Sequence, residues 1–141
     1  MKISELKNPP QWLLDADTLN ADVDIDEYGV LRWLGGEFRG GEFWGGEFRG
    51  GAFLGGEFRG GEFWGEYLTT NPQTVYGLRW IVYVTPMQMQ IGCERHSHEE
   101  WKAFRDETIN NMDIDALAFW NEYKAALLAL CDAQSKHRVQ K

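Results

Sequence analysis

A five-residue phrase repeats between residues 35 and 65, in the stretch GGEFRGGEFWGGEFRGGAFLGGEFRGGEFWG. Each copy places one Phe between glycine pairs, and these residues are Phe38, Phe43, Phe48, Phe53, Phe58 and Phe63. A helix, with about 3.6 residues per turn, would scatter this period around its surface, and the Gly-Gly pairs interrupt the alternation of an ordinary strand. Glycine accepts turn conformations at low steric cost. The repeat therefore predicts a coil of short extended segments, with a corner at each Gly-Gly pair and every Phe inside.

The phrase resembles the repeat of the pentapeptide-repeat family, whose pattern is a small residue, a polar residue, Leu or Phe, a polar residue and Gly. Glu37 and its equivalents stand where Asp or Asn is more usual. The resemblance covers about a third of the chain. It implies a right-handed, four-sided β-helix with four repeats in each coil. The whole layout also resembles small phage and prophage proteins, in which a similar repeat precedes a stretch like IGCERHSHEEW, here Ile91 to Trp101.

A four-sided coil would stack residues that are twenty apart. Like residues then meet on the outside: Leu34 and Leu54, Arg39 and Arg59, Trp44 and Trp64. The same register would extend the core beyond the repeat through Tyr28, Trp33 and Leu68. We therefore expect about two coils over residues 26–70. Such a short coil exposes strand edges at both ends, so other parts of the chain must cover them.

The other segments predict an α+β fold in which the β-helix is followed by strands and a helical pair. Residues 1–25 contain PPQWLLDADTLN, a short apolar segment expected to form a helix that caps the coil. Residues 71–95 contain TVYGLRWIVYV and MQMQIGC, which are expected to form a pair of strands interrupted at Thr85-Pro86.

Residues 96–141 are expected to form two C-terminal helices. Ser97 and Glu100 have the spacing of a capping box, which predicts a first helix through EEWKAFRDETINNM. Asp113 is expected to cap a second helix from about Ile114 to Ser135. Its apolar residues cover more than one stripe, which predicts burial on two sides.

The charge balance limits the classes of partner. The chain has 14 Lys and Arg against 22 Asp and Glu, a net charge of −8, which disfavours direct binding to nucleic acid or to an anionic membrane. No apolar run reaches the roughly 20 residues of a membrane span, and the N-terminus lacks the pattern of a secretion signal. Cys93 and Cys131 are isolated thiols, which fit a reducing compartment. We therefore expect a cytoplasmic protein, located in the host cytoplasm if a phage encodes it.

The sequence CERHSH offers Cys93, His96 and His98 as weak candidates for metal ligands. Zinc usually takes four ligands, and only Cys131 and His137 could complete the set, without a familiar spacing. The other interpretation is a polar junction between a strand and a helix. A nucleophilic Cys-His pair would lack an acidic partner, and the glycines lack the Lys-Ser/Thr of a phosphate loop. We expect no enzymatic activity, no metal and no cofactor.

The outer surface of the repeat carries the candidate binding residues, which are Arg39, Trp44, Arg49, Arg59 and Trp64. The Trp rings could stack on a base while the Arg residues bind phosphate, as in a protein that sequesters a nucleotide signal. Alternatively, the repeated Glu residues could imitate DNA, as some pentapeptide-repeat proteins do, although the interleaved Arg residues offset much of the charge. A third interpretation makes the Trp and Leu residues packing surfaces.

These observations predict a non-catalytic binding protein. Resemblance to phage and mobile-element proteins implies an inhibitor that blocks a host immune activity, with a host protein or a nucleotide signal as its partner. We also expect a homo-oligomer, because one helical pair cannot cover every apolar face of a short coil. The expected interface is either the Trp44/Trp64 face or the outer side of the 114–135 helix.

Overall fold

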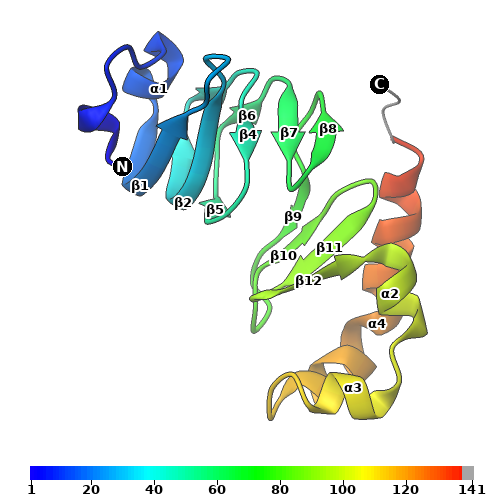
Figure 1. Ribbon diagram of the computed structural model, residues 1–141. Helices are drawn as coiled ribbons and strands as arrows, with labels where there is room; N and C mark the ends of the chain where they lie inside the picture. Colours follow the sequence, from blue (N-terminus) through cyan, green and yellow to red (C-terminus); the bar gives the residue numbers. More distant parts are fainter. Residues whose placement is uncertain (138–141) are drawn as a thin grey trace. The chain divides into compact units, whose positions relative to one another are not determined.

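The computed structural model describes residues 1–137 and divides the chain into two compact units. The repeat unit is Met1–Asn71, and the C-terminal unit begins at Pro72. Strands and helices occur together along the chain (Figure 1), so the α+β class predicted from the sequence is confirmed. No helix in the described part of the chain is long and apolar enough to cross a membrane.

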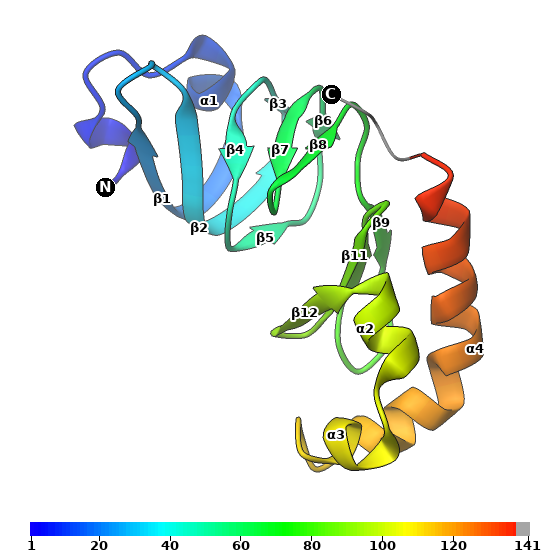
Figure 2. The same cartoon turned by 45° about the vertical axis from the view of Figure 1, so that its right-hand side comes forward.

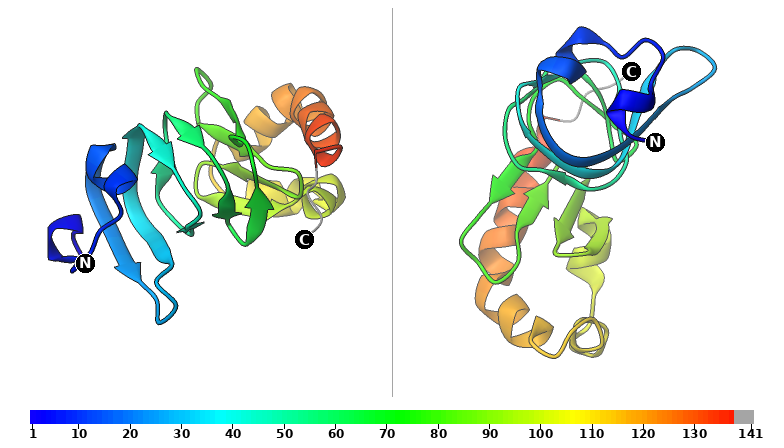
Figure 3. Two further views of the ribbon diagram at one scale, coloured as in Figure 1. Left: turned by 90° about the horizontal axis from the view of Figure 1, so that it is seen from above. Right: turned by 90° about the vertical axis from the view of Figure 1, so that its left-hand side faces the viewer.

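The repeat unit consists of two short helices followed by strands. Its elements are η1 (Ile3–Glu5), α1 (Gln11–Asp15), β1 (Asp17–Ile25), β2 (Leu31–Gly40), β3 (Glu42–Phe43), β4 (Glu47–Phe48), β5 (Ala52–Phe53), β6 (Glu57–Phe58), β7 (Gly61–Phe63) and β8 (Glu66–Leu68). The strands of the repeat wind around a common axis in the right-hand view of Figure 3.

Parallel pairing in the repeat joins residues that are fifteen apart. Trp33 of β2 lies opposite Phe48 of β4, and Phe48 lies opposite Phe63 of β7. The same spacing pairs β2 with β5 and β3 with β6. The predicted register of twenty residues is therefore wrong, and three repeats, not four, separate the paired strands. Both registers place Phe on Phe, because both are multiples of five, so the inward residues could not distinguish them.

Three columns of aromatic rings form the core of the repeat unit. The first column is Trp33, Phe48 and Phe63, the second is Phe38 and Phe53, and the third is Phe43 and Phe58, with nearly parallel rings whose centroids lie 5.0–5.8 Å apart. Rings of different columns meet edge to face at 5.7–6.2 Å. All seven rings are at most 3% exposed, so the prediction that they are buried is confirmed.

The predicted extension of the core is only partly correct. Leu68 is buried, as predicted, but Tyr28 is 83% exposed. Tyr28 lies in the turn between β1 and β2, where its backbone N–H donates to the Asp26 carboxylate. The chain turns back at this position to pair β1 with β2 in antiparallel fashion, so it cannot continue the coil toward the N-terminus.

The glycine pairs lie directly over the backbone of the preceding strands. Gly51 and Gly56 have φ angles of +78° and +90°, in the left-handed region that favours glycine. A Cβ at either position would overlap a carbonyl oxygen fifteen residues earlier, that of Gly36 or Gly41. Both the conformation and the close approach thus require glycine at these corners.

Several edges of the repeat unit are covered by other parts of the chain. β1 pairs with β2 at one edge, and β8 pairs with β7 at the other. Trp12 of α1 lies on Phe43 with ring centroids 4.8 Å apart, but only Gln11–Asp15 of the segment expected to be a capping helix is helical, because β1 begins at Asp17. The side chain of Asn71 accepts from the Phe58 N–H and donates to the Gly56 carbonyl, which covers the backbone of β6. Strand pairing thus covers the edges of β2 and β7, and a side chain covers the edge of β6.

The C-terminal unit contains an antiparallel sheet and helices (Figure 2). The sheet has the order β12-β11-β10-β9, with β9 (Gln73–Val75), β10 (Val82–Val84), β11 (Gln88–Ile91) and β12 (Glu94–Ser97). The helices are α2 (His98–Ala103), α3 (Asp106–Asn110) and α4 (Ala116–Ser135). Their shared core includes Val82, Val84, Met89, Ile91, Trp101, Ile109, Phe119, Trp120 and Leu127.

The helix boundaries agree with the sequence at some positions and differ at others. The capping box of Ser97 and Glu100 is present at the start of α2, as predicted. The expected first helix is broken, because Phe104 and Arg105 have extended backbones. The Phe104 ring packs on His96 and Trp101, which ties the break to the sheet. α4 begins at Ala116, so Asp113 is not its N-cap.

Candidate functional site

The two Trp residues expected on one outer face of the repeat are separated. Trp44 is 49% exposed, whereas Trp64 is only 8% exposed and lies tilted on Phe63, with ring centroids 4.5 Å apart. A register of fifteen places Trp44 beside Arg59 and Trp64 near the column of Arg49, so the two rings lie on different faces. Trp44 is therefore the Trp that the repeat presents to solvent, and the expected Trp44/Trp64 face does not form.

Trp44 is held in place by neighbouring side chains. Its Nε1–H donates to Oε2 of Glu42 at 3.0 Å. Arg59 donates to Oε1 of the same carboxylate at 3.0 Å, and its guanidinium carbon lies 5.9 Å from the centroid of the Trp44 ring. Arg59 also forms an ion pair with Glu57. We call Glu42, Trp44, Glu57 and Arg59 the Trp44 cluster.

The Glu42 carboxylate is the centre of this cluster. The hydrogen bond from Trp44 and then the contact with Arg59 hold the pKa of Glu42 below its usual value. A lowered pKa means that the ionised form is favoured in the folded protein, so these contacts are present at neutral pH and are lost as pH falls through the pKa of Glu42. The Glu42 and Arg59 side chains are 44% and 45% exposed. Solvent therefore weakens the ion pair between Glu42 and Arg59, so the pair adds little stability. Its main effect is to hold the Glu42 carboxylate that orients the Trp44 indole.

A groove of about 240 Å³ lies beside the Trp44 ring. Trp44 forms one wall, and Pro10, Trp12, Ile25 and Leu31 contribute apolar surface to the rest. The groove thus combines an oriented aromatic ring with walls that are partly apolar and partly polar, since Asn8 and glycine backbone also line it. The Glu42 carboxylate is bound to the same ring. Such a surface can accept an apolar side chain that is flanked by positive charge.

The other two candidate arginines, Arg39 and Arg49, are also paired with neighbouring carboxylates. Arg39 forms an ion pair with Glu37 at 3.2 Å, and the Nε–H of Arg49 donates to Glu47 at 2.8 Å. Each Glu precedes its Arg by two residues, a spacing that puts both side chains on the same side of an extended segment. A phosphate group at Arg39, Arg49 or Arg59 would therefore have to compete with a carboxylate.

The expected anionic array is only partly formed. Glu42 lies opposite Glu57, and Glu47 lies opposite Glu62, so two pairs of carboxylates do stack. Ala52 lies opposite Glu37 and interrupts the third pair. The arginines that pair with the array reduce its negative charge.

Cys93, His96 and His98 do not come together as a ligand set. Cys93 is exposed in the turn between β11 and β12, and His96 in β12 has its Nε2 3.0 Å from the Glu94 carboxylate. His98 is buried, with Nε2 2.8 Å from the carbonyl oxygen of Thr85 and 3.2 Å from that of Gln88. Since both neighbours are acceptors, Nε2 carries the proton and donates. His98 thus fastens α2 to the turn between β10 and β11.

The remaining cysteine is part of the core. Cys131 is fully buried, with its sulfur 3.7 Å from that of Met89. Burial raises the pKa of the Cys131 thiol to about 11. Within residues 1–137, no group of three or more His, Cys, Asp and Glu residues is arranged to hold a metal ion.

Sequence reasoning missed the role of Glu42 and the contact between Trp44 and Arg59. The spacing of these two residues, fifteen positions, is a multiple of the repeat and was available as a signal. The match between Trp44 and Trp64, which are twenty residues apart, favoured the wrong register instead. Comparison with family models, curated proteins and solved structures found no match to the chain.

Proposed function

We propose that the protein is a non-catalytic binding protein that uses the Trp44 cluster and its groove to bind a partner protein. The observation that carries this proposal is a half-exposed Trp whose orientation is set by Glu42 and Arg59. Trp is enriched among the residues that dominate binding energy at interfaces. A ring that is already oriented loses less entropy on binding than a free one.

The fold of the repeat supports the proposal because it provides a rigid scaffold for the Trp44 cluster. Parallel pairing at fifteen residues, three ring columns and paired edges together support a short three-sided β-helix for the repeat. In this interpretation the chain is a relative of the pentapeptide-repeat proteins with one repeat fewer in each coil. A scaffold of this kind holds the Trp44 cluster on a surface that changes little on binding.

The charge of the site indicates the kind of partner. The Glu42 carboxylate contacts Trp44 directly, Glu42 and Glu57 share the single cation of Arg59 beside the ring, and the chain as a whole carries a net charge of −8. The matching surface is an apolar side chain flanked by Lys or Arg. The likeness to phage and mobile-element proteins supports a host immune enzyme as that partner, inhibited when its basic surface is covered. This biological role rests on analogy with those proteins.

Sequestering a nucleotide is the second candidate. The contact between Trp44 and Arg59 favours it, because a stacking ring and a guanidinium lie side by side. The carboxylates of Glu42 and Glu57 oppose it, since both bind the same guanidinium. DNA mimicry has less support, because arginines neutralise much of the Glu array.

A capture experiment with matched variants tests the proposed function. The wild-type protein, Trp44→Ala and Tyr28→Ala serve as baits for a bacterial lysate, and the affinity of each captured protein is then measured in purified form. Tyr28 is an exposed aromatic residue outside the cluster, so its removal is the control. We expect Trp44→Ala to weaken binding at least about tenfold and Tyr28→Ala to leave it unchanged. Equal binding by all three baits would contradict the proposal.

A thermal-shift screen separates the two candidates. Nucleotides, linear and cyclic, are added to the purified protein, and a sequestering protein would be stabilised by its ligand. We expect no nucleotide to raise the melting temperature. A rise that Trp44→Ala abolishes would favour the nucleotide function instead.

A further inference from the structure

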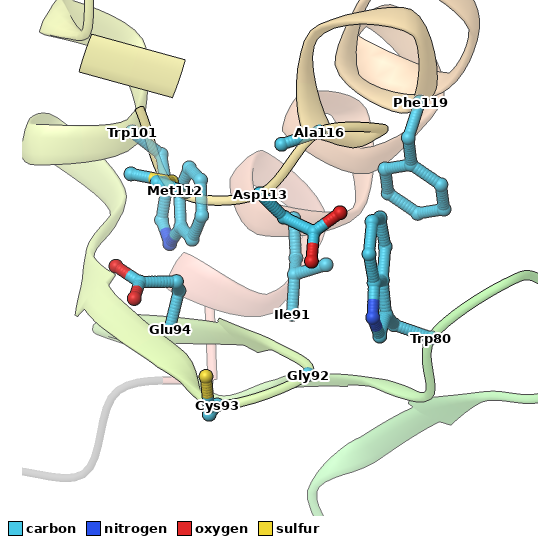
Figure 4. Close-up of a pocket in the computed structure, with 10 residues that line it drawn as sticks. All are labelled: Trp80, Ile91, Gly92, Cys93, Glu94, Trp101, Met112, Asp113, Ala116 and Phe119. Carbon is cyan, nitrogen blue, oxygen red and sulfur yellow. The ribbon is translucent and has the colours of Figure 1, made fainter. Parts of the chain in front are cut away.

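The C-terminal unit contains a small cavity of about 80 Å³ with aromatic walls (Figure 4). Trp80 and Phe119 lie on one side and Trp101 on the other, with Ile91 between them. Two carboxylates, from Asp113 and Glu94, border the same space. Among residues 1–137, no Lys or Arg lines the cavity.

The aromatic walls are fixed before any ligand binds. Trp80 meets Phe119 edge to face, with ring centroids 5.1 Å apart. Trp101 is 2% exposed, and its Nε1–H donates to the Met89 carbonyl at 2.8 Å. Gly92 also lines the cavity, and a Cβ there would lie 3.0 Å from Cδ1 of Trp80. The glycine thus allows the Trp80 ring to lie against the turn between β11 and β12.

Each carboxylate has one oxygen engaged within the chain. Oδ1 of Asp113 accepts from the Asp115 N–H at 2.9 Å, and Oε1 of Glu94 lies 3.0 Å from Nε2 of His96. Within the described part of the chain, the second oxygen of each carboxylate has no hydrogen bond and can accept one from a ligand. Trp80 already interacts with a cation, since the Arg79 guanidinium carbon lies 4.9 Å from its ring centroid while Arg79 pairs with Asp115.

The cavity is too small for a nucleotide or a typical drug-sized ligand, whose sites measure about 300–1,000 Å³. Aromatic faces and carboxylates both attract positive charge. A primary ammonium has three N–H donors, so even with the two remaining carboxylate oxygens one N–H would face apolar side chains such as Ile91, Met112 and Ala116. A methylated ammonium has a diffuse charge and apolar methyl groups, so it matches both features of the lining.

We propose that this cavity binds a trimethylammonium group, carried either by a small molecule such as choline or by a trimethylated lysine side chain. The aromatic rings contact the methyl groups, and Glu94 and Asp113 balance the charge. This site lies in the C-terminal unit and uses no residue of the Trp44 cluster, so it is independent of the binding function proposed above.

The test compares a cation with a neutral molecule of the same shape. Choline and 3,3-dimethyl-1-butanol differ in that a quaternary carbon replaces the nitrogen. Their binding to the full chain is followed through the indole N–H signals of Trp80 and Trp101 in NMR spectra. We expect choline to shift these signals at millimolar concentrations and the neutral alcohol to bind at least about tenfold more weakly. Equal binding of the two, or no shift with choline and with a trimethyllysine peptide, would overturn the proposal.

Variants connect the binding to the two carboxylates. Glu94→Gln with Asp113→Asn removes both charges but keeps an oxygen acceptor for His96 and for the Asp115 N–H. We expect this double variant to lose about tenfold in affinity for choline. Glu122→Gln changes the charge of an exposed residue on α4 that does not line the cavity, and should bind like the wild type. Undiminished binding by the double variant would also overturn the proposal.

A second titration distinguishes a modified protein from a free small molecule as the source of the trimethylammonium group. A short peptide containing trimethyllysine and the same peptide with unmodified lysine are compared with choline. Tighter binding of the trimethyllysine peptide than of choline would assign the site to a modified protein, and the reverse would assign it to a free small molecule. Tighter binding of the unmodified peptide than of both methylated ligands would contradict recognition of the methyl groups.

Discussion

At the scale of single residues, the glycine pairs decide where the repeat can turn and how closely its segments can stack. Gly51 lies over the Gly36 carbonyl in a left-handed conformation, whereas Gly45 has a φ of +69° but has nothing within 4 Å of the position that a Cβ would take. A side chain at Gly45 would cost only the strain of a left-handed backbone, whereas a side chain at Gly51 would also clash with the neighbouring strand.

Replacing each of these glycines with alanine tests that distinction. We expect Gly45→Ala to lower the free energy of unfolding by about 1–2 kcal/mol, the cost of a left-handed Ala. Gly51→Ala should cost about 1–3 kcal/mol more, because the added methyl overlaps the neighbouring strand. Urea unfolding of both variants measures the difference. Equal losses would show that the strands are not stacked as closely as the structure indicates.

The two cysteines are expected to differ in reactivity, because one is buried and the other is exposed. Burial raises the pKa of Cys131 to about 11, so at pH 8 its thiolate is scarce and also inaccessible, whereas Cys93 is exposed. We expect one thiol to react quickly with a disulfide reagent at pH 8 and the second to react only in denaturant. A Cys93→Ser variant should lose the fast reaction. Two fast thiols in the native wild type would contradict the buried position of Cys131.

At the scale of the elements, the sequence predicts local features better than it predicts the register between paired strands. The period of five was enough to place every Phe inside, and Ser97 with Glu100 was enough to locate the start of α2. The offset between strands was not predictable from Phe alone, since every multiple of five keeps Phe in the core. The matches between residues expected on the outside of the coil favoured an offset of twenty, but side chains outside the core constrain stacking weakly.

The break between α2 and α3 was not predictable for a different reason. The segment around Phe104 has no Pro or Gly to stop a helix. Tertiary contacts of Phe104 with His96 and Trp101 accompany the extended backbone. Interactions between elements that are distant along the chain cannot be inferred from helix propensity.

Asn71 provides a test of how the edge of β6 is covered. Its amide makes two hydrogen bonds to the backbone at Phe58 and Gly56, in place of a neighbouring strand. We expect Asn71→Ala to lower the free energy of unfolding by about 1–2 kcal/mol. Thr70→Ala, at the exposed neighbouring position, should change it by less than about 0.5 kcal/mol. Indistinguishable unfolding curves for the two variants would show that the contact does not stabilise β6.

At the scale of the whole molecule, self-association remains a prediction. Leu34 and Trp44 are 37% and 49% exposed on the repeat unit, and Ile114 is 91% exposed next to α4. We expect light scattering at tens of micromolar to give at least twice the mass of one 16.3 kDa chain. Trp44→Glu should reduce the mass if the Trp44 surface is the interface and leave it unchanged if α4 is. A mass of one chain for the wild type would contradict self-association.

The proposed binding surface exists only if strands fifteen residues apart are neighbours, and cysteine cross-linking measures this directly. Glu42 and Glu57 are paired in β3 and β6, and adjacent strands lie about 4.8 Å apart, within the range that a disulfide can span. In a Cys93→Ser background, Glu42→Cys with Glu57→Cys should form an intramolecular disulfide rapidly on mild oxidation. Glu42→Cys with Glu62→Cys, twenty residues apart, should not. Rapid cross-linking of the second pair and not the first would contradict the register and, with it, the contact between Trp44 and Arg59.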